Sequence, residues 1–554
     1  MSSISYFGMK FRPDELTKRR TKESLLPQMR LDWLKIKKFK NLSDFEIDFD
    51  EDELSTVLIG QNGTGKSNVI EALVAIFRDL DLENRTDFAY SLAYQCHGRR
   101  IEIDNGVYSK TQTFRVDGKT VSTKDFRDNK TKFLPDNVFG YYSGASRRLE
   151  QLFDPHQAKY YRHVISPNSQ KDDIEEIDLR RLFYCRSAYG QLALLTYFAR
   201  GSDSARAFLK RQLGISGFDS ALLILRKPRW AGKKPNKNQL ENGDPRFWYA
   251  AGLVRSLLHQ LWEHSLAPFD HRVKEQDDYR TKSASEDQAY IFIRDEKSLR
   301  DIANHFGSEK TFFALLETLD ISDLIREVRI WVKRDDVDGE IPFHEISDGE
   351  KQLLSVLGLM RFTGRDESLF LLDEPDTHLN PAWKWDYLPL VREVAQGNRE
   401  SHIIMTSHDP LTMGGLKASQ VQVMYRDDGN KLVARPPDVE PRGLGFTSIL
   451  TQIFGLPTTV DPNTQEKLDK RNALLRLENR SKAQERDLLE LSNELKRLGF
   501  IIEDREPEYA LFLRALEEVN KDTRSALTPD QILAQNEAAK VMLEKIMAKD
   551  KAHK

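Results

Sequence analysis

The sequence predicts an α/β fold in which two distant segments build one mostly parallel sheet. A mixed, largely helical insertion separates the two segments, and a helical module follows them. Residues 55–59 form a short apolar segment that leads into a glycine-rich loop and then into apolar residues at helical spacing. Residues 369–372 form a second apolar segment, which ends in two acidic residues. Short apolar runs that alternate with helical patterns are typical of buried strands in α/β domains.

The length of the chain predicts several parts. At 554 residues it exceeds a typical domain severalfold. We expect five segments: a basic N-terminal arm at 1–30, the first part of the α/β domain at 31–145, the insertion at 146–339, the second part at 340–458 and a C-terminal helical module for partner or oligomer contacts at 459–554.

Composition excludes several classes of protein. Hydrophobic residues make up 39% and charged residues 31% of the chain, which excludes wholesale disorder and an integral membrane protein. The net charge of −3 excludes a uniformly basic nucleic-acid coat. The N-terminus has no secretory pattern, and two cysteines provide neither a disulfide framework nor a CxxC metal pair. We therefore expect a cytoplasmic protein.

The first elements follow from the alternation of apolar and polar residues. Leu34 and Ile36, and then Phe45 and Ile47, alternate with polar residues, which predicts two antiparallel strands before the strand at 55–59. Apolar residues after the glycine-rich loop recur at helical spacing and predict a helix. These residues are Val69, Ile70, Leu73, Ile76 and Phe77.

The middle and the end of the chain are less regular. Helical runs are expected within 179–213 and a strand at 222–225, without a sustained heptad repeat. Near the end, Leu488, Leu491, Leu495 and Leu498 predict one apolar helix face that stops at Gly499. This face either packs within the chain or docks a partner. Residues 528–531, Thr-Pro-Asp-Gln, predict the N-terminal cap of a last helix.

The glycine-rich loop fits the pattern GxxxxGK[ST], placed between a strand and a helix. In this pattern glycines let backbone N–H groups surround phosphates. Lys66 is expected to reach the β and γ phosphates of ATP, and Ser67 to bind Mg²⁺. The residues expected to bind the nucleotide in this segment are Gly60, Asn62, Gly63, Thr64, Gly65, Lys66, Ser67 and Asn68.

The acidic pair after the second apolar segment complements this loop. Asp373 is expected to orient Mg²⁺, and Glu374 to act as the general base toward water. Lys66, Glu374 and His408 are the expected catalytic residues.

The motifs around the acidic pair resemble those of ABC-type ATPases, in the branch that contains structural-maintenance-of-chromosomes and RecF-like proteins. Residues 346–352, Ile-Ser-Asp-Gly-Glu-Lys-Gln, open a helical run, residues 375–381 follow the acidic pair, and Thr-Ser-His at 406–408 ends an apolar strand. The resemblance implies an ABC-type P-loop ATPase head in a homodimer, or a higher oligomer, with ATP between two heads.

The same resemblance assigns roles to single residues. Ser347, Gly349 and Glu350 would face the nucleotide of the partner chain, and Asp376 would lie in the loop at that interface. His408 would contact the γ phosphate. The family's glutamine loop has no matching glutamine here, and Tyr142, Ser143 or Gln151 can substitute for it.

The overall layout resembles the PtuA family, the ATPases of Septu-type anti-phage defence systems. We find no coiled-coil arm, Toprim arrangement or nuclease motif in the sequence. We therefore expect no nuclease within the chain. The resemblance implies an ATPase that regulates and scaffolds a separate HNH nuclease (PtuB-like), and the sequence leaves open whether its hydrolysis is fast or slow. In retron settings it also implies a reverse transcriptase with its RNA-linked DNA (msDNA).

Other interpretations stay open. The chain could be a RecF-like DNA repair ATPase, or it could contain an unrecognised nuclease site. Two basic segments could contact nucleic acid or could be solvated: the N-terminal 40 residues, with 11 basic and 4 acidic residues, and the segment 226–237, with six basic residues and Trp230.

Overall fold

The computed structural model describes residues 29–164, 180–186, 188–201, 203–232, 234–235, 237–276, 280, 283–335, 340–364, 366–395, 401–477 and 480–498, and positions 530, 531, 533, 534, 537 and 541. The basic arm up to residue 28 lies outside the described residues, as do Gly499 and the cap residues Thr528 and Pro529. In the described part of the chain, no helix combines the length and the apolar character that crossing a bilayer requires.

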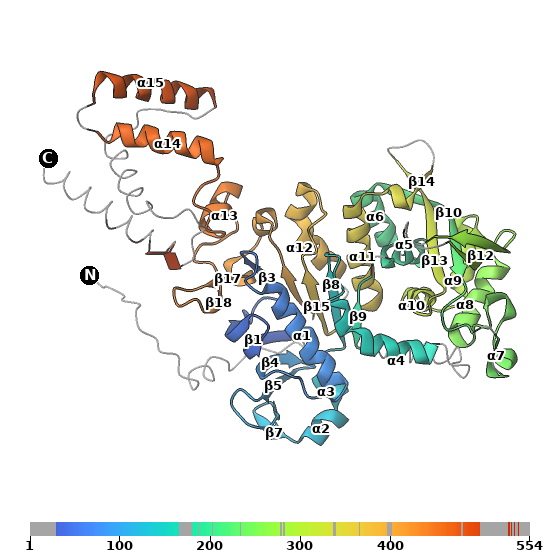
Figure 1. Cartoon of the computed structure of the whole chain (residues 1–554). Helices are drawn as coiled ribbons and strands as arrows, with labels where there is room; N and C mark the ends of the chain where they lie inside the picture. Colours follow the sequence, from blue (N-terminus) through green and yellow to red (C-terminus); the bar gives the residue numbers. More distant parts are fainter. Residues whose placement is uncertain are drawn as a thin grey trace.

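A seven-stranded sheet forms the centre of the molecule, and it confirms the predicted α/β class (Figure 1). Its strand order is β18-β17-β3-β16-β15-β8-β9, and every neighbouring pair is parallel except β17 with β18. The strands are β3 (Ser55–Gly60), β8 (Asn137–Tyr142), β9 (Leu182–Tyr184), β15 (Ser368–Asp373), β16 (His402–Thr406), β17 (Val421–Arg426) and β18 (Leu432–Arg435). The carboxyl ends of β3, β16, β15 and β8 therefore meet at one edge.

A six-stranded antiparallel sheet packs near this centre, in the order β2-β1-β4-β5-β6-β7. The predicted pair of strands is confirmed, because Leu34 lies opposite Ile47 and Ile36 opposite Phe45. The elements are β1 (Arg30–Phe39), β2 (Leu42–Asp48), β4 (Tyr90–Cys96), β5 (Arg99–Asn105), β6 (Thr113–Val116) and β7 (Lys119–Val121), followed by α2 (Thr123–Asp128) and α3 (Lys130–Phe133).

Two hydrophobic cores lie on the two faces of the central sheet. Phe370 and Leu372 of β15 belong to the core shared with the insertion, whereas Leu369 and Leu371 belong to the core shared with the antiparallel sheet. This division follows from the period of two along a strand. Helix α1 (Lys66–Asp81) fills the second core, and its five predicted apolar residues are all fully buried.

The insertion is mixed, as predicted, but it contains more strand than the sequence indicated. Its described helices are α4 (Asp154–Val164), α5 (Tyr189–Arg200), α6 (Asp203–Leu213), α7 (Lys237–Asn242), α8 (Gly252–Glu263), α9 (Glu296–Asn304) and α10 (Glu309–Ile321). A five-stranded antiparallel sheet in the order β11-β12-β10-β13-β14 accompanies them. Its strands are β10 (Ile215–Arg226), β11 (Phe269–Glu275), β12 (Ala284–Ile293), β13 (Ile325–Arg334) and β14 (Glu340–Pro342). The predicted strand at 222–225 is confirmed as part of β10.

Two short strands cross the segment limits that we expected. Strand β9 comes from the insertion but extends the central sheet beside β8. Strand β14 begins the second part of the α/β domain but pairs with β13 of the insertion. The helical interpretation of 179–213 is therefore wrong at its start, where β9 precedes α5 and α6, because parallel pairing with β8 satisfies the backbone of these three residues.

The second part of the α/β domain contains α11 (Asp348–Thr363), α12 (Pro381–Ala395) and α13 (Phe446–Gln452). Short 3-10 turns connect the elements: η2 (Glu150–Leu152), η5 (Pro245–Phe247), η6 (Phe343–Glu345), η8 (Pro410–Met413) and η9 (Ala418–Gln420).

Helices α14 (Pro462–Leu475) and α15 (Lys482–Arg497) form a hairpin away from the central sheet (Figure 1). Of the predicted leucine face, Leu495 is buried and Leu488 and Leu491 are half-buried. Leu498 is 54% exposed, since it follows the last helical residue and does not continue the stripe. Packing between the two helices accounts for the burial of Leu495. Docking of a partner on this face stays a prediction.

Candidate nucleotide site

The glycine-rich loop joins the end of β3 to the start of α1 and holds a positive-φ backbone at three glycines. Gly60, Gly63 and Gly65 have φ values of 145°, 82° and 83°, which are conformations that residues with a Cβ rarely adopt. A Cβ at Gly60 would lie 2.1 Å from the carbonyl oxygen of Met424. The sequence pattern therefore reflects both backbone conformation and close packing, and helix α1 begins at Lys66, directly after the loop.

Lys66 is buried and folds back over the loop. Its Nζ donates to the carbonyl oxygens of Gly60 at 2.8 Å and Gln61 at 3.1 Å. Burial lowers the pKa of Lys66 to about 8, against the opposing charges of Glu374 and Asp373. Its position inside the loop fits the binding of phosphate oxygens, whose negative charge would favour the ammonium form.

Residues from the β1–β2 hairpin hold this loop from outside. Asn41 donates from Nδ2 to the carbonyl of Gly63 at 2.8 Å and accepts from Nδ2 of Asn68 at 2.6 Å. Thr64 donates from its hydroxyl to the carbonyl of Gln61. Asn68 and Thr64 thus shape the loop through their side chains. The sequence alone assigned no role to Asn41, because its partners lie more than 20 positions away.

The acidic pair lies beside the loop, as the sequence predicted for a metal and nucleotide site. The carboxylate of Asp373 accepts from the hydroxyl of Ser67 at 2.9 Å and from that of Thr406 at 2.6 Å. Burial raises the pKa of Asp373, opposed by these hydroxyl groups and by Arg148. A hydroxyl and a carboxylate side by side are oxygen donors of the kind that Mg²⁺ prefers, so the residues fit this ion.

Glu374 has a left-handed backbone with a φ of 53°, which for a residue with a Cβ is a strained conformation that clusters at functional sites. Its backbone N–H donates to the Thr406 hydroxyl at 2.9 Å. Its Oε1 lies 2.9 Å from Nε2 of His408. Burial, followed by the charge of Lys66, lowers the pKa of His408. The imidazole is therefore neutral near pH 7, which suits a donor that orients the carboxylate of Glu374.

Asp376 lies in the loop that follows Glu374, and the role of this loop at an interface between chains stays a prediction. Its side chain is buried, and its carboxylate accepts from the hydroxyl groups of Ser407 and Thr412, each at 2.6 Å. Within the described chain its carboxylate faces the interior, whereas Thr377 and His378 of the same loop are exposed. Asp376 thus anchors the loop to the protein interior, whereas Thr377 and His378 form its exposed surface.

The signature turn forms the N-terminus of α11. Ser347 caps this helix by accepting from the N–H of Glu350, and the Glu350 carboxylate accepts from the N–H of Ser347 at 2.9 Å. Arg334 of β13 also bonds to Glu350 at 3.1 Å. A Cβ at Gly349 would lie 2.5 Å from the carbonyl of His378. Ser347 itself is exposed, and an exposed helix N-terminus suits an anion.

Gln352 connects this helix to the loop after Glu374. Its Nε2 donates to the carbonyl of Pro375 at 2.7 Å, and its Oε1 accepts from the N–H of His378 at 3.2 Å. The sequence analysis quoted Gln352 within the motif but gave it no role, because the pattern alone does not reveal this contact.

Arg148 lies next to Asp373, close in sequence to the segment 138–144 that lacks the expected glutamine. Its guanidinium is 3.2 Å from Oδ2 of Asp373 and 3.4 Å from Oε1 of Glu71, and it stacks on the ring of Tyr142 at 4.7 Å. Ser143 bonds through its hydroxyl to Thr377 at 3.2 Å. Of the three expected substitutes, Tyr142 supports Arg148, Ser143 contacts the loop after Glu374, and Gln151 is exposed in η2.

The basic segment 226–237 is partly neutralised. Arg226 and Arg229 both contact Asp323, and the indole N–H of Trp230 donates to the carbonyl of Ser322 at 2.7 Å. Lys233 and Asn236 lie outside the described residues. Trp230 therefore packs on the insertion, and nucleic-acid binding by this segment stays a prediction.

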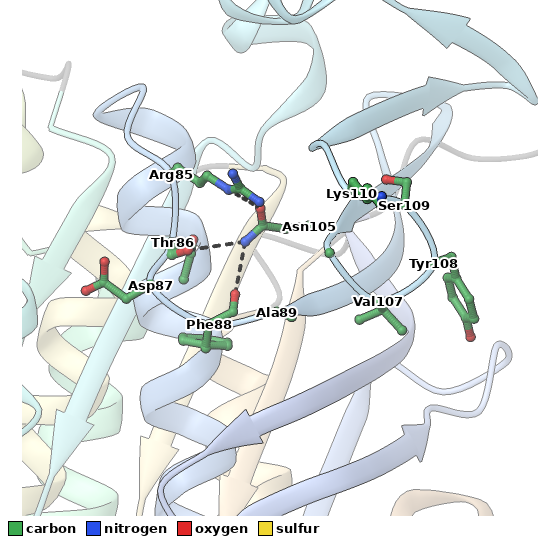
Figure 2. A pocket seen from close by; sticks show the side chains of 11 residues that line it. Arg85, Thr86, Asp87, Phe88, Ala89, Asn105, Val107, Tyr108, Ser109 and Lys110 are labelled. Atoms are coloured by element: carbon green, nitrogen blue, oxygen red, sulfur yellow. Dashed lines mark hydrogen bonds between the residues drawn. The ribbon is translucent and has the colours of Figure 1, made fainter.

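A separate hollow of about 790 Å³ lies between residues 85–89 and 105–110, at the edge of the antiparallel sheet (Figure 2). Asn105 donates to the carbonyls of Thr86 and Phe88 and accepts from Arg85, so these bonds fix the wall of the hollow. None of the predicted site residues is among the described residues that line it.

Comparisons with known proteins agree with the P-loop geometry. The family model described as "AAA domain, putative AbiEii toxin, Type IV TA system" matches residues 55–414. Two curated relatives match more locally. The Septu protein PtuA of Bacillus mycoides (strain KBAB4) is 24% identical over 161 residues, which are 28% of this chain and 22% of that protein. The Septu protein PtuA of Bacillus thuringiensis is 29% identical over 160 residues, 26% of this chain and 40% of that protein. The chain thus spans between about a fifth and two fifths of the length of these relatives.

Solved structures with related chain traces include the SMC head domain from Thermotoga maritima. It is 12% identical, with a TM-score of 0.29, and the match covers 74% of this chain and all of that one. The recombination mediator protein RecF with ATP is 15% identical, with a TM-score of 0.23, over 70% of this chain and 94% of that one.

Proposed function

This chain belongs to the family described as "AAA domain, putative AbiEii toxin, Type IV TA system", and from this membership we propose that it is a P-loop ATPase. We propose that two copies of the chain bind and hydrolyse ATP between them. ATP binding and hydrolysis would control a separate nuclease in anti-phage defence. The matched region, residues 55–414, includes the glycine-rich loop, the acidic pair and His408.

One observation carries the ATPase proposal. The carboxyl ends of three adjacent parallel strands bring four residues together. Lys66 follows β3, Asp373 ends β15 and Glu374 follows it, and His408 follows β16. Ligands of open α/β sheets bind at this edge. The Ser67–Asp373 and His408–Glu374 contacts, both 2.9 Å, link residues that lie far apart in the sequence into one site.

The chemistry follows from the positions of these groups. The loop N–H groups and Lys66 bind the phosphates, and Ser67 and Asp373 hold Mg²⁺. When bound, that ion would neutralise charge on the β and γ phosphates. Glu374 accepts the proton of the attacking water. Neutral His408 keeps the Glu374 carboxylate in place and donates toward the γ phosphate when the carboxylate turns to water.

The second half of the site comes from a partner chain in this proposal. Ser347 is exposed at a capped helix N-terminus, so its turn can bind the γ phosphate on another copy. Gln352, one turn further along α11, holds the loop that follows Glu374. Contact at the signature turn can therefore alter the position of Glu374 through one helix and one loop.

The defence role rests on narrower support. Two relatives bear the name Septu protein PtuA, and the motifs of the sequence resemble that family. We propose an HNH nuclease (PtuB-like) as the effector, restrained or positioned by the paired ATPase heads. A reverse transcriptase with its msDNA is a further proposed partner where the gene lies in a retron.

Two substitutions test the ATPase role. Lys66→Ala removes the ammonium from the phosphate loop, and we expect ATP binding to fall at least tenfold in a fluorescent-nucleotide assay. Glu374→Gln keeps the shape of the side chain but removes the base, so ATP should bind normally while hydrolysis falls by about 10²-fold or more. Hydrolysis by Glu374→Gln at the wild-type rate would contradict the assignment.

The partner proposal has a separate test. The chain is coexpressed with a PtuB-like HNH nuclease, and copurification is measured with ATP and without it. A stable complex whose nuclease activity changes with Glu374→Gln supports the proposal. No complex under either condition contradicts it and leaves the ATPase assignment intact.

A further inference from the structure

We propose that Cys96, His97 and Glu367 bind one zinc ion at the edge of the central sheet opposite the nucleotide site. Cys96 ends β4 and His97 begins the turn to β5, while Glu367 directly precedes β15. One donor atom from each of the three residues lies within 4.8 Å of the others. The set is formed by the antiparallel sheet and the central sheet together.

The backbone of the turn directs neighbouring side chains to the same place. Adjacent residues of an extended strand point to opposite faces. His97 has a φ of 50°, and Gly98, which follows it, has a φ of 67°. This left-handed turn breaks the alternation after Cys96, so the Cys96 thiol and the His97 ring both contact the carboxylate of Glu367. The His97 backbone N–H donates to Glu367 as well.

The contacts of the His97 ring leave one nitrogen for a ligand. Nε2 lies 3.2 Å from the carbonyl oxygen of Leu134 and 3.5 Å from Oδ1 of Asp136. A carbonyl oxygen only accepts, so Nε2 carries the hydrogen and Nδ1 of a neutral ring presents a lone pair. A metal-bound histidine commonly donates its other N–H to a carbonyl or carboxylate in this way.

Nδ1 lies 3.4 Å from Oε1 of Glu367, so two electron-pair donors face each other. Such a contact is stable only with a cation between the donors. The cation is either a proton on His97 or a metal ion. The thiol of Cys96 beside the same carboxylate provides a third donor, which a metal uses and a proton does not need.

The chemistry of the donors selects zinc. Thiolate, imidazole and carboxylate together are typical zinc ligands, with a water molecule in an open fourth position. Ligand atoms of a tetrahedral zinc lie roughly 3.3–3.8 Å apart. Nδ1 of His97 and Oε1 of Glu367 are already 3.4 Å apart, and the remaining separations lie within 4.8 Å, so they would shorten by at most about 1 Å. The Cys96 thiolate and Glu367 would balance the dication, and the nearby Arg181 is paired with Asp81 at 2.9 Å.

Bound zinc would fasten the β4–β5 turn to the amino end of β15, the strand that carries Asp373 at its other end. Asp136, which directly precedes β8, the neighbour of β15 in the sheet, would orient the His97 ring. The zinc would thus have a structural role, linking the antiparallel sheet to the strands that carry the nucleotide site. Its side chains are partly open to solvent at His97 and Asp136, both about one quarter exposed, so an ion can enter.

Metal content of the full-length protein tests the proposal. We expect about one zinc per chain by mass spectrometry after dialysis against metal-free buffer without chelator. Cobalt(II) added to the chelator-stripped protein should give a thiolate charge-transfer band in the near ultraviolet. Cys96→Ser should abolish that band and reduce zinc at least fivefold. Cys185→Ser, at the other buried cysteine, should change neither.

His97→Asn provides a second variant in case Cys96→Ser does not fold, and it should also lose the zinc. Wild-type protein that binds neither zinc nor cobalt stoichiometrically would overturn the proposal and leave a proton as the cation between His97 and Glu367. Full retention of zinc in folded Cys96→Ser would overturn it equally. These readouts are independent of ATP hydrolysis and therefore of the proposed function.

Discussion

Arg148 places a guanidinium on the carboxylate that we expect to hold Mg²⁺. It contacts Oδ2 of Asp373 at 3.2 Å, while Ser67 bonds to Oδ1 at 2.9 Å. Arg148 is about one third exposed and is also held by Glu71 and Tyr142. A cation at Asp373 therefore competes with Arg148, unless the arginine moves to another anion such as a phosphate.

Replacing Arg148 tests this competition. We expect Arg148→Ala to lower the Mg²⁺ concentration required for half-maximal ATP binding by about threefold to tenfold, the effect of one partly exposed charged contact. A Mg²⁺ titration with a fluorescent ATP analogue measures it. Arg147→Ala is the matched control, because Arg147 is more exposed and pairs with Glu150 and Asp154. A higher Mg²⁺ requirement in Arg148→Ala would show that Arg148 assists the metal.

The burial of His402 leads us to expect that the stability of the fold depends on pH. It is fully buried, accepts from the N–H of Leu31 at 3.0 Å and contacts the hydroxyl of Thr56 at 3.3 Å. Burial, and then the charge of Arg30, lowers the pKa of His402 to about 3. Below the unfolded pKa of about 6.5 the unfolded chain binds a proton that the folded chain excludes, so stability falls as pH falls.

The slope for this one group approaches about 1.4 kcal/mol per pH unit between pH 6.5 and 3. We expect the melting temperature of the wild type to fall more steeply from pH 7.5 to 5 than that of His402→Gln, whose amide oxygen can still accept from Leu31. Parallel curves for the two proteins would disprove the role of His402.

At the scale of single residues, the sequence predicts the groups that a fixed spacing defines. Lys66 and Ser67 follow from the loop pattern, and Asp373 and Glu374 from a strand that ends in acids. Arg148, Asn41 and Gln352 could not be found in this way. Their partners come from other elements, and nothing in the local sequence marks such contacts. The burial of the Asp376 carboxylate was not predictable either, because its motif position does not reveal the contacts with the hydroxyl groups of Ser407 and Thr412.

Among the elements, the end of α1 connects the nucleotide helix to the insertion. Asp81, the last residue of α1, contacts Nε2 of His156 in α4 at 2.9 Å and Nε of Arg181 at 2.9 Å. These partners, opposed by burial, lower the pKa of Asp81 to about 2. The ionised form is favoured above the unfolded value of 3.8, and its stabilisation is lost as pH falls through about 2.

Asp81→Asn removes this charge. We expect a loss of about 1–2 kcal/mol of unfolding free energy at pH 7, less than the full pKa shift implies because the side chain is partly solvated. Urea unfolding measures it. Glu83→Gln is the control, since Glu83 lies on the surface and pairs with Lys130. Equal stability of Asp81→Asn and the wild type would show that the contacts with His156 and Arg181 contribute nothing.

The sequence predicts most accurately those elements that bury one apolar face and expose the other. The β1–β2 pair and α1 have regular spacing of apolar residues, and both were confirmed. In the insertion's sheet only part of β10 was predicted. The edge strand β11 escaped prediction because it is charged and carries Phe269, which is 55% exposed. Strand β9 has only three residues, so no period could be read from it.

In the whole molecule, the central sheet separates two cores and carries the nucleotide site at one edge. The antiparallel sheet and α1 cover one face, and the insertion packs against the other (Figure 1). The α/β class was predictable because the motifs occur in a fixed order along the chain. The way the insertion joins the sheet was not, since it depends on the pairing of β9 with β8, two strands separated along the chain by α4.

A single chain presents both halves of the proposed site on its surface, the phosphate loop and the signature turn at Ser347. The proposed function requires that these halves meet between two chains. Placing a large, positively charged side chain at position 347 should therefore prevent association of two chains without changing the P-loop of the same chain.

Sedimentation of Glu374→Gln with ATP and Mg²⁺ tests this central claim most directly, with the Glu374→Gln/Ser347→Arg double variant in parallel. We expect ATP to double the mass of the Glu374→Gln species, and the double variant to bind ATP without this change. If ATP leaves the mass of Glu374→Gln unchanged, or if Ser347→Arg associates equally well, two copies do not close over the nucleotide through this turn.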